Sequence, residues 1–223
     1  MKSFGLFCFS LLLSLALWAQ EPVDSLAEQL GDDEEVLDNP DVNPESKTGI
    51  ILGTGFCRYI GKEPNNPALA MMLSGGFYHR VRFKPHWSFQ PALMISLKGS
   101  NFDNDTGSIG SIKSYHVDVP ILFLYGLNEN NTSNIIGGLQ YSRLLSAVLY
   151  RENYVFPEDI QPALSSHDLS LAGGMQYHTP FVGFQFILKY GLLNTNRGFI
   201  QGILPLNEGK SMHQFTFEAS LIF

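Results

Sequence analysis

HQFTFEASLIF, residues 213–223, is the stretch that decides the fold, because apolar and polar residues alternate along it to the last position. Its apolar positions are Phe215, Phe217, Ala219, Leu221 and Phe223, and Ile222 is the one apolar residue among the polar ones. Strict alternation predicts a β-strand with one apolar and one polar face. Such a strand suits either the edge of a soluble sandwich or a closed barrel, the only β-structure that lipid tolerates.

The aromatic residue at the last position favours the barrel. The segment resembles the C-terminal strand of bacterial outer-membrane barrels, in which the terminal aromatic is part of the signal that the assembly machinery reads. The resemblance implies that the barrel assembly machinery and outer-membrane lipid are partners of this chain. The assembly signal would consist of Phe215, Phe217, Leu221 and Phe223.

The other end of the chain predicts export. A basic start at Met1–Lys2 precedes an almost unbroken apolar run over Phe4–Trp18, and Ala19 is a small residue at a suitable place for cleavage. This run is too short for a spanning helix and is typical of a secretory signal peptide. We therefore predict a signal peptide over residues 1–19, with cleavage after Ala19 or Gln20.

The next segment is strongly acidic. Glu21–Ser46 contains ten acidic residues and no Lys or Arg, and such a segment buries too little apolar surface to offset the entropy of ordering. We predict a disordered periplasmic tail over residues 20–47 and a barrel over residues 48–223. From Lys47 onward there are 13 basic and 11 acidic residues, so the net charge of −7 comes from the tail. The near-neutral barrel predicts no nucleic-acid partner.

Eight segments of the barrel region alternate in the same way, with apolar residues on one face and the charges on the other. This is the inverse of a soluble core and predicts an all-β fold, an eight-stranded antiparallel up-and-down transmembrane barrel with lipid outside. The predicted strands are Thr48–Ile60, Ala68–Phe83, His86–Gly99, Ile112–Leu127, Asn134–Ala147, His167–Thr179, Phe181–Asn194 and Met212–Phe223.

The connections between these segments alternate in length. Three are short, at Lys84–Pro85, Asn128–Thr132 and Thr179–Pro180. The other four are longer, namely Gly61–Pro67, Ser100–Ser111, Val148–Ser166 and Thr195–Lys210. Outer-membrane barrels have short periplasmic turns and long extracellular loops, so both chain ends are predicted to lie in the periplasm.

The inward positions carry charges that could fill the lumen. We predict that they neutralise one another and plug the barrel, with a proton or ion path as the alternative. Asp118 and Glu218 are expected to pair with a base among Arg80, Arg82 and Lys98. The predicted lumen charges are Arg80, Arg82, Lys98, His116, Asp118, Asp168, His178, Lys189 and Glu218.

The sequence predicts no cofactor, no metal site and no catalytic residue. It contains no HExxH, CxxC or GxSxG motif, and Cys57 is the only cysteine after the signal peptide, which excludes an internal disulfide. Ser165, Ser166 and His167 are the nearest approach to a nucleophile and base. Neighbouring residues of a strand point to opposite faces, so Ser166 and His167 are not placed to share a hydrogen bond.

Five of the segments resemble the PorT-like outer-membrane β-barrel family of the Bacteroidota. SFQPALMISLKGSNF resembles the family's strand with the pattern LQPEL-x-YS-x-KG, and SYHVDVPILFLYGL resembles its Y-x-x-IP-x-x-x-KY strand. NIIGGLQYSRLLSA, SHDLSLAGGMQY and FILKYGLLN resemble three more. The chain departs from the pattern in two places. Met94–Ser96 stands where the family usually has Leu-Tyr-Ser, and Lys189 stands where it has arginine. The resemblance implies the fold and the membrane more firmly than an activity.

Two functions fit these observations. One is a non-enzymatic accessory or structural component of an envelope assembly, such as a secretion-related one, that acts through the acidic tail or the loops. The other is a surface adhesion or ligand-binding barrel that acts through its extracellular loops alone. The sequence names neither the partner nor the oligomeric state.

Overall fold

The computed structural model describes residues 46–61, 67–104, 107–128, 131–151, 157–179, 181–197 and 211–223. The predicted signal peptide and almost all of the predicted acidic tail lie outside the described residues. Among the described residues, no helix is long and apolar enough to cross a membrane.

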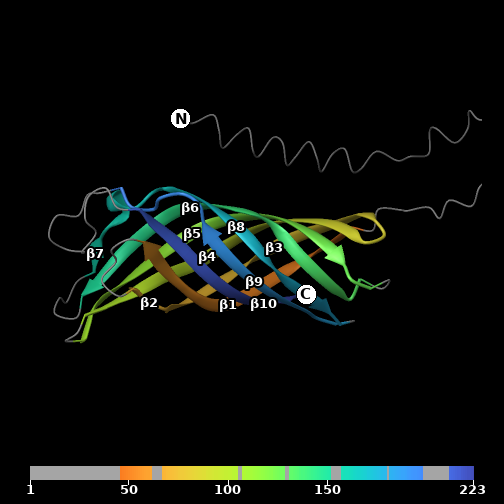
Figure 1. Ribbon diagram of the computed structural model, residues 1–223, viewed down its shortest axis with the longest axis horizontal. Helices are drawn as coiled ribbons and strands as arrows, with labels where there is room; N and C mark the ends of the chain where they lie inside the picture. Colours follow the sequence, from red (N-terminus) through yellow and green to blue (C-terminus); the bar gives the residue numbers. More distant parts are fainter. Residues whose placement is uncertain are drawn as a thin grey trace, which may run out of the picture. The chain divides into compact units, whose positions relative to one another are not determined.

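Eight long strands make up the fold, and Figure 1 shows them wound obliquely around a common axis. Two two-residue strands, β2 (Pro67–Ala68) and β7 (Glu158–Asp159), and a short 3-10 helix, η2 (Gln161–Ala163), accompany them. The long strands are β1 (Ser46–Gly61), β3 (Ala70–Lys84), β4 (Trp87–Asn104), β5 (Gly107–Gly126), β6 (Ser133–Arg151), β8 (His167–His178), β9 (Gly183–Gly191) and β10 (Met212–Ile222).

The sheet closes on itself. Each long strand pairs antiparallel with the next one along the chain, and β10 returns to pair with β1 over a register that runs from Ile51↔Ile222 to Gly61↔Met212. Closure removes both edges of the sheet, so every long strand has a neighbour on each side. The predicted eight-stranded antiparallel barrel is confirmed.

Two of the predicted long connections were wrong. Most of Ser100–Ser111 is strand, since β4 and β5 stay paired as far as Asn104↔Gly107. In the same way β6 continues into the predicted connection Val148–Ser166 as far as Arg151. Strands β4, β5 and β6 therefore extend beyond the other strands at this end of the barrel, which we call the extended end. The opposite end, which carries the short turns and both ends of the barrel sequence, we call the short-turn end.

The predicted inside and outside faces hold along the membrane-facing part of the strands. β9 alternates strictly between buried and exposed residues, and Phe184, Phe186, Leu188 and Tyr190 are its exposed ones. Large apolar side chains cover the outer surface of the other strands as well. This is the arrangement of a lipid-facing barrel, because the same surface in water would expose a large apolar patch.

Apolar residues also lie inside the barrel, where the sequence analysis emphasised the charges. At the extended end, Tyr59, Ile112, Leu144 and Leu149 form a buried cluster together with Ile160 of the segment that precedes η2. At this level the pattern is that of a soluble core, with apolar residues inside and Lys113 exposed. A second cluster near the short-turn end contains Ile222, the apolar residue on the polar face of the terminal strand.

Candidate functional site: the barrel lumen

The middle of the lumen holds a fully buried ion pair. Lys98 of β4 places its Nζ 3.0 Å from both carboxylate oxygens of Asp118 on β5. Ser96 donates a hydrogen bond of 2.7 Å to Asp118 Oδ2, and Lys98 Nζ donates one of 3.3 Å to Ser142 Oγ. Hydrogen bonds from neutral groups offset part of the cost of taking both charges out of water.

A second buried pair joins β9 to β10. Lys189 Nζ lies 2.5 Å from Glu218 Oε2, while Ser74 and Ser220 donate hydrogen bonds of 2.7 and 3.0 Å to Glu218 Oε1. The expectation that Glu218 pairs with Arg80, Arg82 or Lys98 was therefore wrong. Lys189 lies on the strand that pairs directly with β10, in register beside Thr216, and so reaches Glu218 first.

At the short-turn end, Arg80 of β3 is bound by two neutral side chains. Its guanidinium donates hydrogen bonds of 3.0 and 2.7 Å to Gln90 Oε1 and one of 2.6 Å to Gln176 Oε1. Arg80 belongs to neither of the two buried ion pairs described above. Arg82 lies two residues further along β3 and His178 ends β8, so both of these predicted lumen charges also lie at this end.

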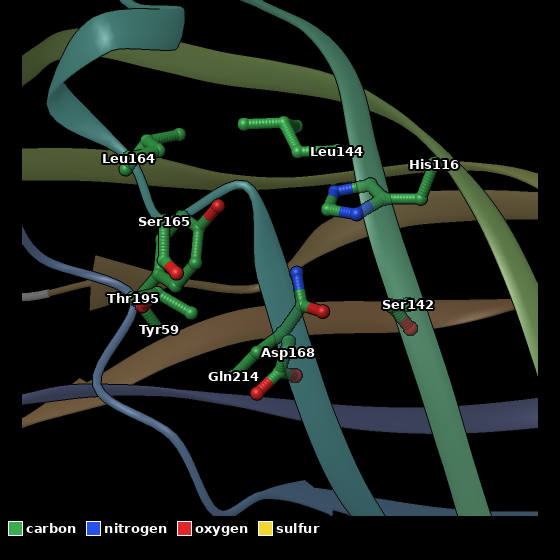
Figure 2. A pocket seen from close by; sticks show the side chains of 9 residues that line it. All are labelled: Tyr59, His116, Ser142, Leu144, Leu164, Ser165, Asp168, Thr195 and Gln214. Atoms are coloured by element: carbon green, nitrogen blue, oxygen red, sulfur yellow. The ribbon is translucent and has the colours of Figure 1, made fainter. Parts of the chain in front are cut away.

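At the extended end, Asp168 and His116 line a small cavity (Figure 2). Its water-accessible volume is about 10 Å³, which corresponds to about one water molecule. Asp168 accepts a hydrogen bond of 3.0 Å from Ser170 at one oxygen, and His116 Nε2 lies 2.9 Å from Ser114 Oγ. Neither Asp168 Oδ1 nor His116 Nδ1 has a protein partner.

The nine predicted lumen charges thus fall into separate groups along the barrel axis. Two ion pairs occupy the middle, Arg80, Arg82 and His178 lie toward the short-turn end, and His116 and Asp168 toward the extended end. The hydrogen-bonding serines and glutamines between these groups were not singled out in the sequence. Their signal was available, because they occupy the same inward positions of the alternating pattern as the charges do.

The serines beside His167 do not form a catalytic pair with it. The His167 ring stacks on Tyr141 and its Nδ1 lies 2.5 Å from the Tyr141 hydroxyl oxygen, on the outer surface. Ser165 Oγ instead donates to the backbone carbonyl of His167 at 2.8 Å. Among the described residues, no group of three or more His, Cys, Asp or Glu side chains is arranged to hold a metal ion.

A closed barrel with an apolar exterior and buried charges inside is what an outer-membrane protein requires. The family model described as "Outer membrane protein beta-barrel domain" matches residues 60–196, which is more than half of the chain. The chain belongs to this family. It is a protein of the outer membrane of a Gram-negative bacterium.

Solved structures of other outer-membrane proteins are similar to this chain at low sequence identity. Neisserial surface protein A (NspA) is 11% identical with a TM-score of 0.50, and the match covers 80% of this chain and 97% of NspA. Ail, the attachment invasion locus protein of Yersinia pestis, is 14% identical with a TM-score of 0.41, covering 80% and 99%. OprG from Pseudomonas aeruginosa is 12% identical with a TM-score of 0.38, covering 80% and 97%. No curated protein matches the chain.

As a member of this outer-membrane family, the barrel has a definite orientation. Short turns face the periplasm in such proteins, so the short-turn end is periplasmic and the extended end projects from the cell. The residues of the predicted assembly signal lie on the lipid-facing side of β10, where Phe217, Leu221 and Phe223 are exposed. Their reading by the assembly machinery stays a prediction.

The lumen of this outer-membrane barrel leaves no room for a side chain at Gly53. A methyl group there would lie 2.5 Å from Glu218 Oε1 and 2.7 Å from Ser220 Oγ. We expect Gly53→Ala to displace Glu218 from Lys189 and to lower the free energy of unfolding by about 1–3 kcal/mol. Urea titration of the barrel in lipid vesicles, followed by Trp87 fluorescence, measures this change.

Gly137→Ala is the matched control, because a methyl group at Gly137 meets nothing within 4 Å. We expect that substitution to leave the stability unchanged or to raise it by up to about 1 kcal/mol, since alanine loses less backbone entropy than glycine in a strand. Equal losses for the two variants would show that the lumen has space beside Glu218.

Proposed function

We propose that this protein is a non-enzymatic accessory component of an envelope assembly, anchored by the barrel and acting through its periplasmic face and its acidic segment. The observation that carries the proposal is the filled lumen. At the barrel centre Lys98 neutralises Asp118, and Lys189 neutralises Glu218. A barrel of eight strands has an interior that side chains just fill. Such a lumen serves as a scaffold, and interactions are left to the two ends.

The finer assignment to the PorT-like branch and to a secretion-related assembly belongs to the same proposal. Its support is the set of motif-like runs, which fall on five successive long strands, β4, β5, β6, β8 and β9. Within these runs, Gln90 and Lys98 have structural reasons to be retained, since one binds Arg80 and the other pairs with Asp118. These contacts explain why a family would keep such residues without assigning them an activity.

The test is affinity purification from detergent-solubilised membranes with three forms of the protein. These are the full chain, a form that lacks Glu21–Ser46, and a form in which the ten acidic residues of that segment are replaced by Asn or Gln. We expect envelope proteins to be recovered with the full chain at low salt and to be lost with both altered forms. Their recovery should fall as salt rises, because exposed charges are screened over roughly 8 Å at physiological ionic strength.

Recovery of the same proteins with all three forms would contradict a role for the acidic segment. Partners that persist under those conditions but disappear when the β4–β5 hairpin tip is shortened would favour the alternative, a surface-binding barrel that acts through its extended end. The two results separate the two functions because one function acts through the acidic segment and the other through the hairpin.

A further inference from the structure

Basic residues follow one another around the outer surface of the barrel, toward its extended end. They lie on β1, β5, β6, β8 and β10, which together with β9 are neighbouring strands of the closed sheet. The exposed ones are Arg58, Lys113 and Arg143, and the half-buried ones are His167 and His213. We call these five residues the outer cationic arc.

Each residue of the outer cationic arc stands two positions beyond a large apolar or aromatic residue of its own strand, in the direction of the extended end. Side chains two positions apart share a face of the sheet, so the arc lies on the same side as the lipid-facing residues. The arc therefore adjoins the apolar outer surface at a similar place on five strands. The apolar residues that precede it are Phe56, Tyr115, Tyr141, Leu169 and Phe215.

Strand register brings members of the arc together in two pairs. Arg143 of β6 is the register partner of His167 on β8, which puts their Cβ atoms about 5 Å apart. Across the seam between β1 and β10, Arg58 is opposite Phe215, and His213 is the next residue on that face of β10. Diagonal neighbours of this kind lie roughly 7–8 Å apart. Each pair therefore offers two basic side chains to a single ligand.

Tyrosine rings hold both histidines of the arc in place. The His167 ring stacks on Tyr141 with the ring centroids 5.8 Å apart, and the His213 ring stacks on Tyr190 with the centroids 5.7 Å apart. A side chain that is already fixed loses little conformational entropy when a ligand binds to it. The two pairs are thus preorganised on the outer surface.

The arc lacks a counter-charge on its own face of the long strands. Among the long-strand carboxylates whose side chains the structure describes, Asp118, Asp168 and Glu218 are all buried in the lumen. Within the described part of the chain, neither Arg58 nor Arg143 forms an ion pair. A positive surface next to a lipid-facing band attracts anionic headgroups.

Phosphate is the anion that suits these side chains. The guanidinium fork of arginine donates two parallel hydrogen bonds to a phosphate group, and a neighbouring imidazole adds a further donor when it is protonated. A phosphorylated lipid also brings acyl chains, which extend along the apolar residues that precede the arc. Headgroup and chains then both have a matching surface on this barrel.

We propose that the outer cationic arc binds the phosphate groups of lipid headgroups in the outer leaflet. Arg143 and His167 hold one headgroup, and Arg58 and His213 hold another at the seam of the barrel. The proposal does not rest on the proposed function, because it is tested with purified protein and lipid alone.

The experiment uses the full chain in micelles of an uncharged detergent and counts bound lipid molecules by native mass spectrometry. The probe is phosphatidic acid, and diacylglycerol with the same acyl chains is its phosphate-free match. We expect phosphatidic acid to bind at least roughly tenfold more tightly at low salt, and this advantage to shrink as salt rises. Equal binding of the two lipids would overturn the proposal.

Charge-removing variants locate the site. We expect Arg58→Gln and Arg143→Gln each to weaken the binding of phosphatidic acid roughly fivefold, and the double variant roughly thirtyfold, because distant sites contribute independently. Arg143→Lys should weaken binding less than Arg143→Gln, since it keeps the charge and loses only the paired donors.

Lys84→Gln is the matched control, because Lys84 is exposed beside Trp87 at the opposite, short-turn end. This variant should leave binding of phosphatidic acid unchanged. A loss as large as that of the arginine variants would overturn the arc as the binding site and show attraction by net charge alone. Heat-modifiable migration on gels verifies that each variant is folded.

Inorganic phosphate separates a lipid site from a site for any phosphate. At the same concentration as the lipid, it should leave phosphatidic acid bound, because it has no chains to pack on apolar residues such as Tyr141 and Phe215. Displacement of the lipid by an equal concentration of inorganic phosphate would overturn lipid as the ligand of the arc.

Discussion

Replacing Asp118 with asparagine is expected to lower the free energy of unfolding of the barrel by about 3–5 kcal/mol. The amide keeps the size of the carboxylate and still accepts the hydrogen bond from Ser96, but it leaves the ammonium group of Lys98 without a counter-charge at 2% exposure. A buried charge that loses its partner retains the whole cost of its desolvation. Equilibrium urea titration in lipid vesicles measures the loss.

Asp159→Asn is the matched control, since it makes the same chemical change at an exposed carboxylate that accepts a hydrogen bond from the backbone N–H of Gln161. An exposed change of this kind should stay within about 0.5 kcal/mol. The double variant Lys98→Met, Asp118→Leu should recover much of the stability, because it removes both charges together. A double variant as unstable as Asp118→Asn alone would mean that packing, and not charge, determines the loss.

Ile121→Arg is expected to cost about 2–4 kcal/mol, the penalty for an arginine that faces lipid near the bilayer midplane. Ile121 is 42% exposed on the outer face of β5, between Tyr115 toward the extended end and Tyr125 at the short-turn end. The edge-to-face contact of Tyr125 with Trp87 marks the periplasmic aromatic belt. The same folding titration reports the penalty.

Leu127→Arg provides the comparison, since Leu127 is exposed just beyond the periplasmic end of β5. The penalty for arginine falls to about 0–1 kcal/mol near the membrane surface, so this variant should be nearly as stable as the unaltered barrel. Similar costs at the two positions would place residue 121 outside the hydrocarbon layer and would contradict the assigned membrane depth.

The sequence predicts the strand number and the two faces because the side-chain period of a strand is two, so one apolar face fixes the orientation of every residue. It fails where the outer surroundings change. Over Ser100–Ser111 the alternating apolar pattern that predicts lipid-facing strands is absent from the sequence, although the β4–β5 hairpin continues to Asn104↔Gly107. Loop-like composition there does not mark the end of the sheet.

The lumen contacts were predictable as a class but not as pairs. Alternation places Glu218 and Lys189 inside the barrel, but which charges meet depends on the stagger between strands, and alternation leaves this stagger open. The register Thr216↔Lys189 decides that Glu218 binds Lys189. The same holds for Arg80, whose glutamine partners come from β4 and β8, strands far apart in the sequence.

The seam between the first and last strands has a consequence for the time course of assembly. Ile51 pairs with Ile222, so the contact that closes the ring joins residues from opposite ends of the barrel sequence. Contacts of such long range make folding slow, because the entropy of closing the loop is lost before the contact forms. Until β10 arrives, β1 and β9 each have an unpaired backbone edge, which the hydrocarbon layer does not accept. A chain halted before its last eleven residues would therefore remain outside the bilayer, and insertion and completion of the barrel form a single kinetic event.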